Sequence, residues 1–264
     1  MALIFVLVGF ALVFSTSTWA FGPSIDLANA DASFIGERDT ALSGWSVASA
    51  GDVNRDGSDD FLIGAYGDEE GGADAGQTYL ILGKDPADWG KGFDLANADA
   101  SFIGEDVDDW SGNSVASAGD VNGDGYDDFL IGAYGNEGGG ADAGQTYLIL
   151  GKYTGWAMDT DLWRAHASFI GEDADDLSGA SVASAGDVNG DGYDDFLIGA
   201  YGNEEGGSSA GQTYLLLGSK TPPVVGVGGE VYYVNKGNVL APWLALAAAI
   251  IAGGIILRRR ISQG

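Results

Sequence analysis

Three short loops carry the side chains in this sequence whose types and spacing could do chemistry. Each loop spells Asp-x-Asn-x-Asp-Gly-x-x-Asp. Alternate oxygen-bearing residues in a tight loop converge on one point, and glycine at position six permits the turn that lets residue seven offer its carbonyl. Hard oxygen ligands in this number favour Ca²⁺ over zinc or copper, and a flexible protein cage favours it over Mg²⁺. The sequence therefore predicts three calcium sites.

The predicted ligands occupy positions one, three, five, seven and nine of each loop, the seventh through its backbone carbonyl. They are Asp52, Asn54, Asp56, Ser58 and Asp60 in the first loop, Asp120, Asn122, Asp124, Tyr126 and Asp128 in the second, and Asp187, Asn189, Asp191, Tyr193 and Asp195 in the third. An EF-hand would need a bidentate Glu at position twelve, where Ile63, Ile131 and Ile198 stand in predicted strands. The alternative is an acidic turn without metal, and three matching loops favour calcium over it.

The composition excludes several classes of function. Acidic residues number 39 against 11 basic ones, for a formal net charge of −28, which argues against nucleic acid because its phosphates need Lys and Arg. The same charge also favours solubility in water. There is no cysteine and a single histidine, His166, expected at the surface. Zinc sites and histidine triads are therefore disfavoured, and we expect no enzyme.

The acidic loops belong to a longer internal repeat. Asp52, Asp120 and Asp187 lie 68 and 67 residues apart, and self-similarity at a fixed period indicates stacked units. Each period contains four short apolar runs bounded by Gly, Asp or Asn, which is typical of strands. They are "SFIGE" at Ser33, Ser101 and Ser168, "SVASAG" at Ser46, Ser114 and Ser181, "FLIGA" at Phe61, Phe129 and Phe196, and "GQTYL" at Gly76, Gly144 and Gly211. Four strands per repeat predict an all-β fold of β-propeller-type blades, with a β-sandwich as the alternative.

The centre of each repeat resembles the FG-GAP repeat, the blade of integrin-α-type propellers, in particular its prokaryotic surface or secreted form. The matching segments are "SGWSVASAGDVNRDGSDDFLIGAYG", "SGNSVASAGDVNGDGYDDFLIGAYG" and "SGASVASAGDVNGDGYDDFLIGAYG". The resemblance covers roughly residues 24–219. It implies that the loops bind calcium at the edge of the propeller. The chain departs from the family motif by having Ser-Gly for Phe-Gly and Gly-Ala-Tyr for Gly-Ala-Pro, which alters turn packing and no metal ligand.

The sequence divides into seven predicted segments. They are a signal peptide at 1–20, FG-GAP repeats at 21–93, 94–160 and 161–219, a linker at 220–236, a transmembrane helix at 237–257 and a basic cytoplasmic tail at 258–264. The uncharged run 237–257 would span roughly 30 Å as a helix, the thickness of a bilayer core. The three arginines that follow predict a cytoplasmic tail and an exterior N-terminal domain. No Lys or Arg precedes the first apolar run, so an uncleaved anchor is the alternative there.

The resemblance also predicts how the blades are completed. In integrin-type propellers the outer strand of a blade comes from the start of the next repeat, so the runs at Ser101 and Ser168 should finish the first and second blades. The third blade then lacks its outer strand, and the run at Ser33 has no blade of its own. Unpaired edges invite pairing with another chain. We expect a head-to-tail homo-oligomer of two chains that completes a six-bladed ring. The alternatives are an open three-blade stack, with "EVYYV" at Glu230 as a cap on the third blade, and a shortened gene product.

The predicted function is a membrane-anchored exterior module for adhesion or ligand binding, with an extracellular protein or glycan as partner. The alternative is a calcium-rigidified envelope protein without a specific ligand. The tryptophans near the repeat junctions are expected to pack rather than to form a sugar platform. They are Trp89, Trp110, Trp156 and Trp163. The acidic, glycine-rich loops that start at Gly67, Gly135 and Gly202 are predicted flexible connections at one rim, where a second weak cation site is the alternative.

Overall fold

A computed structural model describes residues 24, 26–208, 210–220, 225–227 and 230–232. The predicted signal peptide, transmembrane helix and basic tail lie outside these residues, as does most of the predicted linker. Within the described ranges, no helix combines the length and the apolar character needed to cross a membrane. The predicted membrane anchor therefore stays a prediction.

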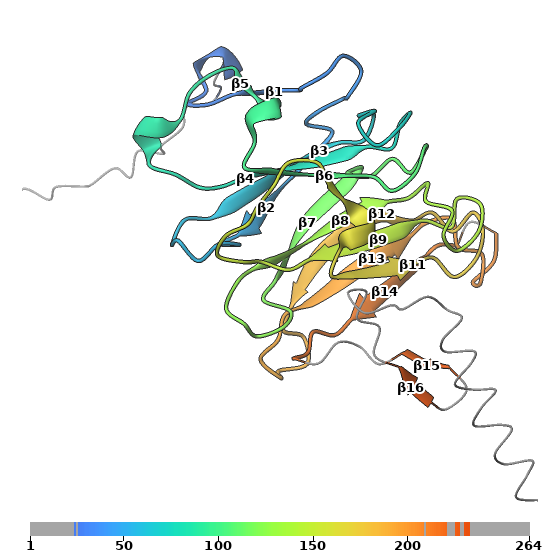
Figure 1. The fold of residues 1–264 in the computed structure, drawn as a ribbon. Helices are drawn as coiled ribbons and strands as arrows, with labels where there is room; N and C mark the ends of the chain where they lie inside the picture. The colour runs from blue at the N-terminus through green and yellow to red at the C-terminus, as the bar shows by residue number, and fades with distance from the viewer. Residues whose placement is uncertain (1–23, 25, 209, 221–224, 228–229, 233–264) are drawn as a thin grey trace, which may run out of the picture.

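The described residues are all-β, with three sheets that follow one another along the chain and are antiparallel except where β10 joins β6 (Figure 1). The first contains β2 (Ser46–Gly51), β3 (Asp60–Ala65), β4 (Gln77–Ile81) and β6 (Ala100–Ile103), with β10 (Thr160–Asp161) beside β6. The second contains β7 (Ser114–Gly119), β8 (Asp128–Ala133), β9 (Gln145–Ile149) and β11 (Ala167–Ile170). The third contains β12 (Ser178–Gly186), β13 (Asp195–Ala200) and β14 (Gln212–Leu216). We call them blades 1, 2 and 3.

The predicted exchange of outer strands between repeats is confirmed. β6 begins the second repeat yet pairs with β4 of blade 1, where Ala100 lies opposite Leu80. β11 begins the third repeat and pairs with β9 of blade 2, where Ala167 lies opposite Leu148. Blade 3 ends at β14 and has no fourth strand among the described residues.

The first "SFIGE" run belongs to none of the three blades. Its strand β1 (Phe34–Ile35) pairs in parallel with β5 (Phe93–Asp94) in a two-stranded sheet. β15 (Val225–Val227) and β16 (Glu230–Tyr232) form another separate pair, so the described part of "EVYYV" does not extend blade 3.

Four 3-10 helices complete the described structure: η1 (Leu27–Asn29), η2 (Pro86–Asp88), η3 (Leu95–Asn97) and η4 (Leu162–Arg164). Each begins after an Asp whose carboxylate accepts the backbone N–H two residues on, which is the usual N-cap bond. Each is a single turn, and Leu95 of η3 and Leu162 of η4 are buried in the core.

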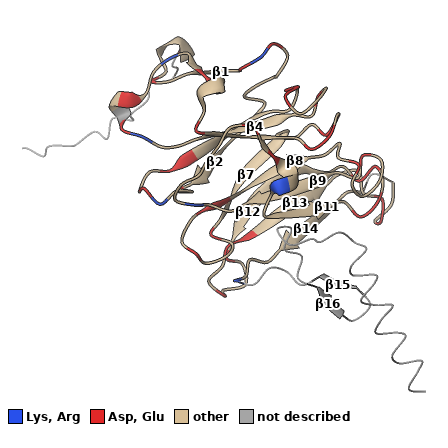
Figure 2. Cartoon of the chain, in the orientation of Figure 1, with Lys and Arg blue, Asp and Glu red and all other residues tan. Residues whose placement is uncertain are grey.

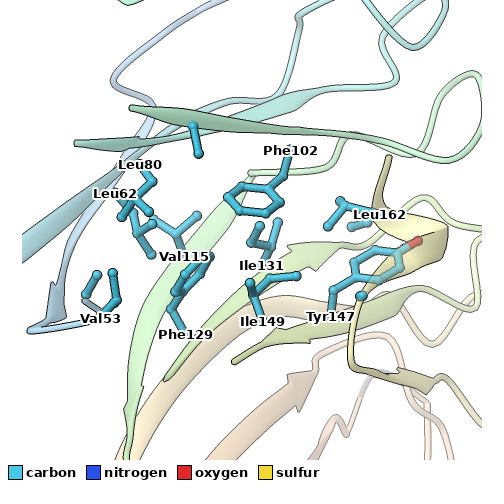
Figure 3. Close-up of a cluster of buried hydrophobic side chains, with 14 residues drawn as sticks. Val53, Leu62, Leu80, Phe102, Val115, Phe129, Ile131, Tyr147, Ile149 and Leu162 are labelled. Atoms are coloured by element: carbon cyan, nitrogen blue, oxygen red, sulfur yellow. The ribbon is translucent and has the colours of Figure 1, made fainter. Parts of the chain in front are cut away.

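The apolar core lies between the blades. Figure 3 shows Leu62 and Leu80 of blade 1 on one side of a cluster that includes Val115 and Phe129 of blade 2. A second cluster joins blade 2 to blade 3 through Leu130 and other residues. Strands β3, β4, β8 and β9 are therefore apolar on both faces, as the sequence predicted, because a neighbour covers each face.

Blade 3 departs from this pattern. Its strand β14 alternates half-buried and exposed residues, whereas the matching strands β4 and β9 are buried throughout. The sequence of β14 is nearly the same as that of β4 and β9, so the difference comes from the surroundings. Among the described residues, no fourth blade follows blade 3 along the chain.

The blades are arranged as in a propeller, and the described residues form no closed ring. Inner strands β2, β7 and β12 contact one another from blade to blade, as strands nearest a propeller axis do. Small residues in "SVASAG" allow this close approach. Ser46 donates its hydroxyl to the Gly112 carbonyl of the next blade at 2.7 Å.

Candidate functional site

The three acidic loops occupy the same place in each blade. Each joins an inner strand to the strand beside it: β2 to β3, β7 to β8 and β12 to β13. All three inner strands run in the same sense in the stack, so the loops gather at one end of it. Figure 2 shows that acidic residues are concentrated in loops, whereas the strands are largely uncharged.

Within the first loop, polar oxygens turn inward toward backbone N–H groups. The Asp52 carboxylate accepts the N–H groups of Asp56 (3.1 Å) and Gly57 (2.9 Å). The Asn54 Oδ1 atom accepts the same Asp56 N–H at 2.8 Å. Oxygens from positions one and three therefore converge on one point inside the loop. The Asp56 carboxylate in turn accepts the Ser58 N–H at 2.8 Å.

The other two loops repeat this bonding and add one bond. Gly123 and Gly190, at position four, donate their N–H groups at 2.7 Å to Asp120 and Asp187 respectively. Both glycines have left-handed backbone, with φ of 72° and 76°. Position four of the first loop is Arg55, which adopts φ 57°, a conformation that costs a residue with a Cβ about 1–2 kcal/mol.

The ninth-position aspartates lie at the buried base of the loops. Asp60 accepts the N–H groups of Val53 (2.9 Å) and Gly83 (2.7 Å), one with each carboxylate oxygen. Asp128 and Asp195 make the same pair of bonds in their own blades. Burial raises the pKa of Asp60 to about 6 and that of Asp128 to about 7. These carboxylates tie the loop to the strand edge, a role the sequence did not predict.

The pKa values of two exposed loop carboxylates are shifted in the opposite direction. The hydrogen bond from the Asn54 amide lowers the pKa of Asp56 below its usual value, because it stabilises the charged form. At position one of the third loop, the Gly192 N–H lowers the pKa of Asp187 for the same reason. These exposed carboxylates are therefore held in the ionised form that binds cations.

The structure brings together the predicted ligands at positions one, three and five in every loop. Position nine lies beneath them, and the backbone of position seven is tied to position five. Among the described residues there is no group of three or more His, Cys, Asp or Glu side chains arranged to hold a metal ion. The donor set of carboxylate, amide and carbonyl oxygens has the chemistry that Ca²⁺ prefers.

The eighth-position aspartates have a role that the loop motif does not reveal. The Asp127 carboxylate of blade 2 accepts the Asp52 N–H of blade 1 at 2.8 Å, and Asp194 of blade 3 accepts the Asp120 N–H of blade 2 at 3.0 Å. The acidic loops of blades 1 and 2 are therefore each held by the blade that follows. Comparison of the three loops shows that position eight is always Asp, which is the only signal the sequence offers.

A buried pair of one Asp and one Asn side chain lies in blades 2 and 3 at the end opposite the acidic loops. The Asn136 amide donates to Asp109 at 3.0 Å, and the Asn203 amide donates to Asp176 at 3.1 Å. In blade 1, Ala41 replaces the Asp of this pair and Asp68 replaces the Asn. The buried carboxylate of blade 1 is therefore at the position that the Asn holds in the other two blades. Burial raises the pKa of both Asp68 and Asp109.

Near this pair, the loops of blade 3 enclose an acidic hollow of about 960 Å³. It is lined by residues 172–176 and 202–205, which include Glu172, Asp173, Asp175, Glu204 and Glu205. The predicted alternative of a second cation site falls here. The buried carboxylate beneath the hollow, Asp176, already accepts the Asn203 amide, and the other acids are exposed.

Aromatic side chains gather at the end of the blades opposite the acidic loops. Trp45 lies against Tyr66 with ring centroids 4.9 Å apart, and Trp110 against Tyr134 at 5.0 Å. Tyr201 of blade 3 holds the matching position and is exposed. The Gly-Ala-Tyr departure from the family motif supplies the three tyrosines.

The predicted packing of the junction tryptophans is confirmed in part. Trp89 and Trp156 pack against the phenylalanines of blades 1 and 2, and Trp110 packs on Tyr134. For Trp163 the prediction is wrong: this side chain is exposed on η4, where it contacts Arg164. His166 is exposed as predicted, and its Nδ1 atom accepts the Leu150 N–H at 3.0 Å.

Repeated antiparallel blades, each with an acidic Asx loop between its first two strands, define a class of propeller-type repeat proteins. The FG-GAP repeat model matches residues 43–81, 111–149 and 178–216. The chain is an FG-GAP repeat protein.

Curated relatives agree with this assignment. The chain is 32% identical over 199 residues to integrin alpha pat-2 of Caenorhabditis briggsae, covering 70% of this chain and 14% of that one. It is 31% identical over 192 residues to integrin alpha-PS2 of Drosophila melanogaster (70% and 12%). It is 31% identical over 172 residues to integrin alpha-5 of Xenopus laevis (63% and 14%). The chain thus spans about a seventh or less of these relatives, none of which is prokaryotic, so the prokaryotic form stays a prediction.

Proposed function

We propose that this chain is a calcium-binding, non-catalytic extracellular module that binds a protein or glycan ligand and is held at the membrane by residues 237–257. The observation that carries the proposal is the threefold repetition of one acidic loop, with the same internal bonding, within FG-GAP repeats. Similarity to integrin alpha chains supports a role in adhesion or ligand binding rather than in catalysis.

Calcium binding is supported by the arrangement of each loop. The carboxylates at positions one and five and the amide oxygen at position three would hold the ion, together with the carbonyl at position seven. The ninth-position carboxylate keeps lone pairs beyond the two backbone bonds it accepts. The bound cation would neutralise charges that otherwise repel one another within a few residues.

Ligand binding is supported by the aromatic end of the stack. Trp45 and Tyr201 are exposed there, although large aromatic side chains are usually covered in a monomer. Aromatic residues dominate the energetics of protein interfaces, and their flat faces also suit sugars. The acidic loops lie at the other end, so cations would stiffen the blades without occupying this surface.

Calcium binding can be tested by titrating the full chain with Ca²⁺ in a calorimeter after chelation. We expect about three ions per chain, with Kd on the order of 10⁻⁴ to 10⁻³ M as in other extracellular modules. Because the ion binds only the folded form, Tm should rise with calcium concentration. Asp56→Asn should remove one ion, whereas Asp88→Asn, a charge-matched change on exposed η2, should remove none. Heat and Tm unchanged by calcium would refute this part of the proposal.

Ligand binding can be tested by applying the full chain to glycan and extracellular-protein arrays. Trp45→Ala should weaken any specific signal, whereas Trp163→Ala, which removes an exposed tryptophan away from the aromatic end, should leave it unchanged. A chain that binds calcium but nothing on the arrays, and that forms an ordered layer on cells, would favour the structural envelope protein instead.

A further inference from the structure

Adjacent blades in this chain are joined by one interface that occurs twice. Between blades 1 and 2, the Asp127 carboxylate accepts the Asp52 N–H at 2.8 Å, and the Asp127 N–H donates back to the Asp52 carbonyl at 3.3 Å. The Lys152 N–H donates to the Val53 carbonyl at 2.8 Å. The side of a blade that faces the preceding blade is called its leading face below, and the other side its trailing face.

Between blades 2 and 3 every one of these bonds recurs. The Asp194 carboxylate accepts the Asp120 N–H at 3.0 Å, and its own N–H donates to the Asp120 carbonyl at 3.2 Å. The Ser219 N–H donates to the Val121 carbonyl at 2.8 Å. The interface is therefore a property of the repeat. It specifies which groups any further blade would have to present.

The trailing face of blade 3 carries the residues of this interface, and no further blade covers it among the described residues. Val188 is 54% exposed, although the matching Val53 is 0% exposed in blade 1. Leu215 is 48% exposed, against 0% for the matching Leu80. Among the described residues, no group accepts the Ser181 hydroxyl as Gly112 accepts that of Ser46.

The leading face of blade 1 likewise exposes residues that are covered at the matching positions of blade 2. Val47 is 68% exposed, whereas the matching Val115 of blade 2 is 8% exposed beneath blade 1. Asp59, the counterpart of Asp127 and Asp194, is exposed, and its carboxylate accepts no N–H group from another blade among the described residues. Each end of the stack thus lacks what the other end offers.

Strand β1 shows where the missing contact would begin. The Phe34 ring lies 5.3 Å from Phe61, just as Phe102 of the outer strand β6 lies 5.5 Å from Phe129 of the next blade. β1 also pairs in parallel with β5, as β6 pairs in parallel with β10. The other edge of β6 is occupied by β4, whereas the other edge of β1 is open among the described residues. β1 therefore occupies the place of an outer strand whose blade is not among the described residues.

We propose that this blade is blade 3 of a second copy of the chain. β14 of one copy pairs antiparallel with β1 of its partner in the register of the two internal outer strands, which places Leu215 opposite the partner's Ala32. The Asp59 carboxylate then accepts the N–H of the partner's Asp187. The two surfaces are complementary, because surfaces of the same two types already bind each other twice within this chain.

The same geometry sets the number of copies. A contact between two different surfaces generates either a closed ring or an open filament. Propellers close with about four to eight blades, and six is the only multiple of three in that range. Two copies therefore close one ring, leaving no exposed edge at β14 or β1. This proposal is independent of calcium and of any ligand.

The molecular mass of the full chain in solution, measured by sedimentation with chelator and with calcium, tests the proposal. We expect a dimer. Gly199→Ala should yield a folded monomer, because within the chain its new Cβ clashes only with the rotatable Ser181 hydroxyl, whereas the matching Gly64 lies against the Gly112 carbonyl of the next blade. Leu215→Asp should act in the same way. Asp88→Asn should remain a dimer. A wild-type monomer, or an open polymer, would overturn the proposal.

Disulfide trapping tests the register separately, since the chain has no cysteine of its own. Opposed residues on antiparallel strands are close enough for a disulfide. Ala32→Cys combined with Leu215→Cys should give a covalent dimer under mild oxidation. Ala167→Cys with Leu148→Cys, an opposed pair within one chain, is the matched control and should give a cross-linked monomer. Covalent dimers that form equally well from Ala32→Cys with Thr213→Cys would contradict the register.

Discussion

The Asp127 carboxylate lies 2.8 Å from the backbone nitrogen of Asp52, so the side chain of one blade holds the first residue of the acidic loop in the blade before it. The bond is partly buried and its acceptor is charged. Gly51 stands directly beside it, with φ 76°, and a Cβ there would lie 2.1 Å from Asp127 Oδ2. The glycine is therefore required for the carboxylate to reach the loop.

Replacing this carboxylate should destabilise the contact between blades 1 and 2. Asp127→Ala leaves the Asp52 N–H without its acceptor, and loss of a hydrogen bond to a charged group costs about 1.5–3 kcal/mol. Asp194→Ala should cost about the same, because it makes the same bond in the next interface. Urea unfolding of the two variants would measure this, with Asp88→Asn as a control expected within about 0.5 kcal/mol of the native chain. Equal stability of all four proteins would contradict the role.

Much of the fold could be predicted from the sequence, because the repeat exposes it three times. The strands, their order and the exchange of β6 and β11 between repeats all follow from the period and the family resemblance. The role of position eight did not follow, because Asp127 looks like one more acid in an acidic loop. Its partner, Asp52, is 75 residues away, and only the stacking of blades brings them together.

The buried Asp–Asn pair is a second feature that could not be predicted from the sequence. Asp109 and Asn136 are 27 residues apart, as are Asp176 and Asn203. In the first repeat Ala41 and Asp68 hold these places, so the acid has changed sides. Aligning the three repeats would have revealed this exchange, but its meaning depends on burial, which the sequence pattern of an acidic rim loop does not convey.

The close contact between blades predicts a second effect on stability. A Cβ at Gly132 would lie 2.0 Å from the Gly179 carbonyl oxygen, which belongs to the backbone of the next inner strand and cannot rotate away. Gly132→Ala should therefore force blades 2 and 3 apart and cost about 1–3 kcal/mol or more. Gly199→Ala is the matched change in blade 3 and should cost clearly less within one chain. Thermal melts in dilute solution would compare them, and equal losses would contradict the explanation.

The buried carboxylate of Asp109 predicts a pH dependence. Burial raises its pKa in the folded chain, the nearby charge of Asp106 adds to this, and the donors Asn136 and the N–H groups of Asp106 and Glu105 oppose it. The folded state then holds a proton that the unfolded state has lost. This contribution to stability is present below about pH 4, the ordinary range for Asp, and is lost as pH rises through the raised pKa.

Asp109→Asn should remove that contribution. The stability of the variant should depend less on pH than that of the native chain between about pH 4 and 7, with the difference largest where Asp109 would ionise. Urea unfolding at intervals across this range, in chelator, would measure the difference. Asp88→Asn supplies the control for loss of one exposed carboxylate. Parallel curves for the Asp109 variant and the native chain would rule out a buried ionisation at this site.

The last prediction concerns Arg55, the one cation inside the acidic loops. Its guanidinium lies 5.3 Å from the Tyr126 ring and 3.5 Å from the Asp124 carbonyl oxygen, so its charge stands beside the second loop. If that loop binds calcium, Arg55→Gln should tighten binding there. A unit charge about 8 Å from a divalent ion in water costs about 1 kcal/mol, or roughly a fivefold change in Kd. Calorimetric titration should find this gain at low ionic strength, and salt should reduce it through screening.

Arg164→Gln, which removes an arginine stacked on exposed Trp163, is the matched control and should leave all affinities unchanged. A gain that is the same at low and high salt would contradict an effect of the Arg55 charge.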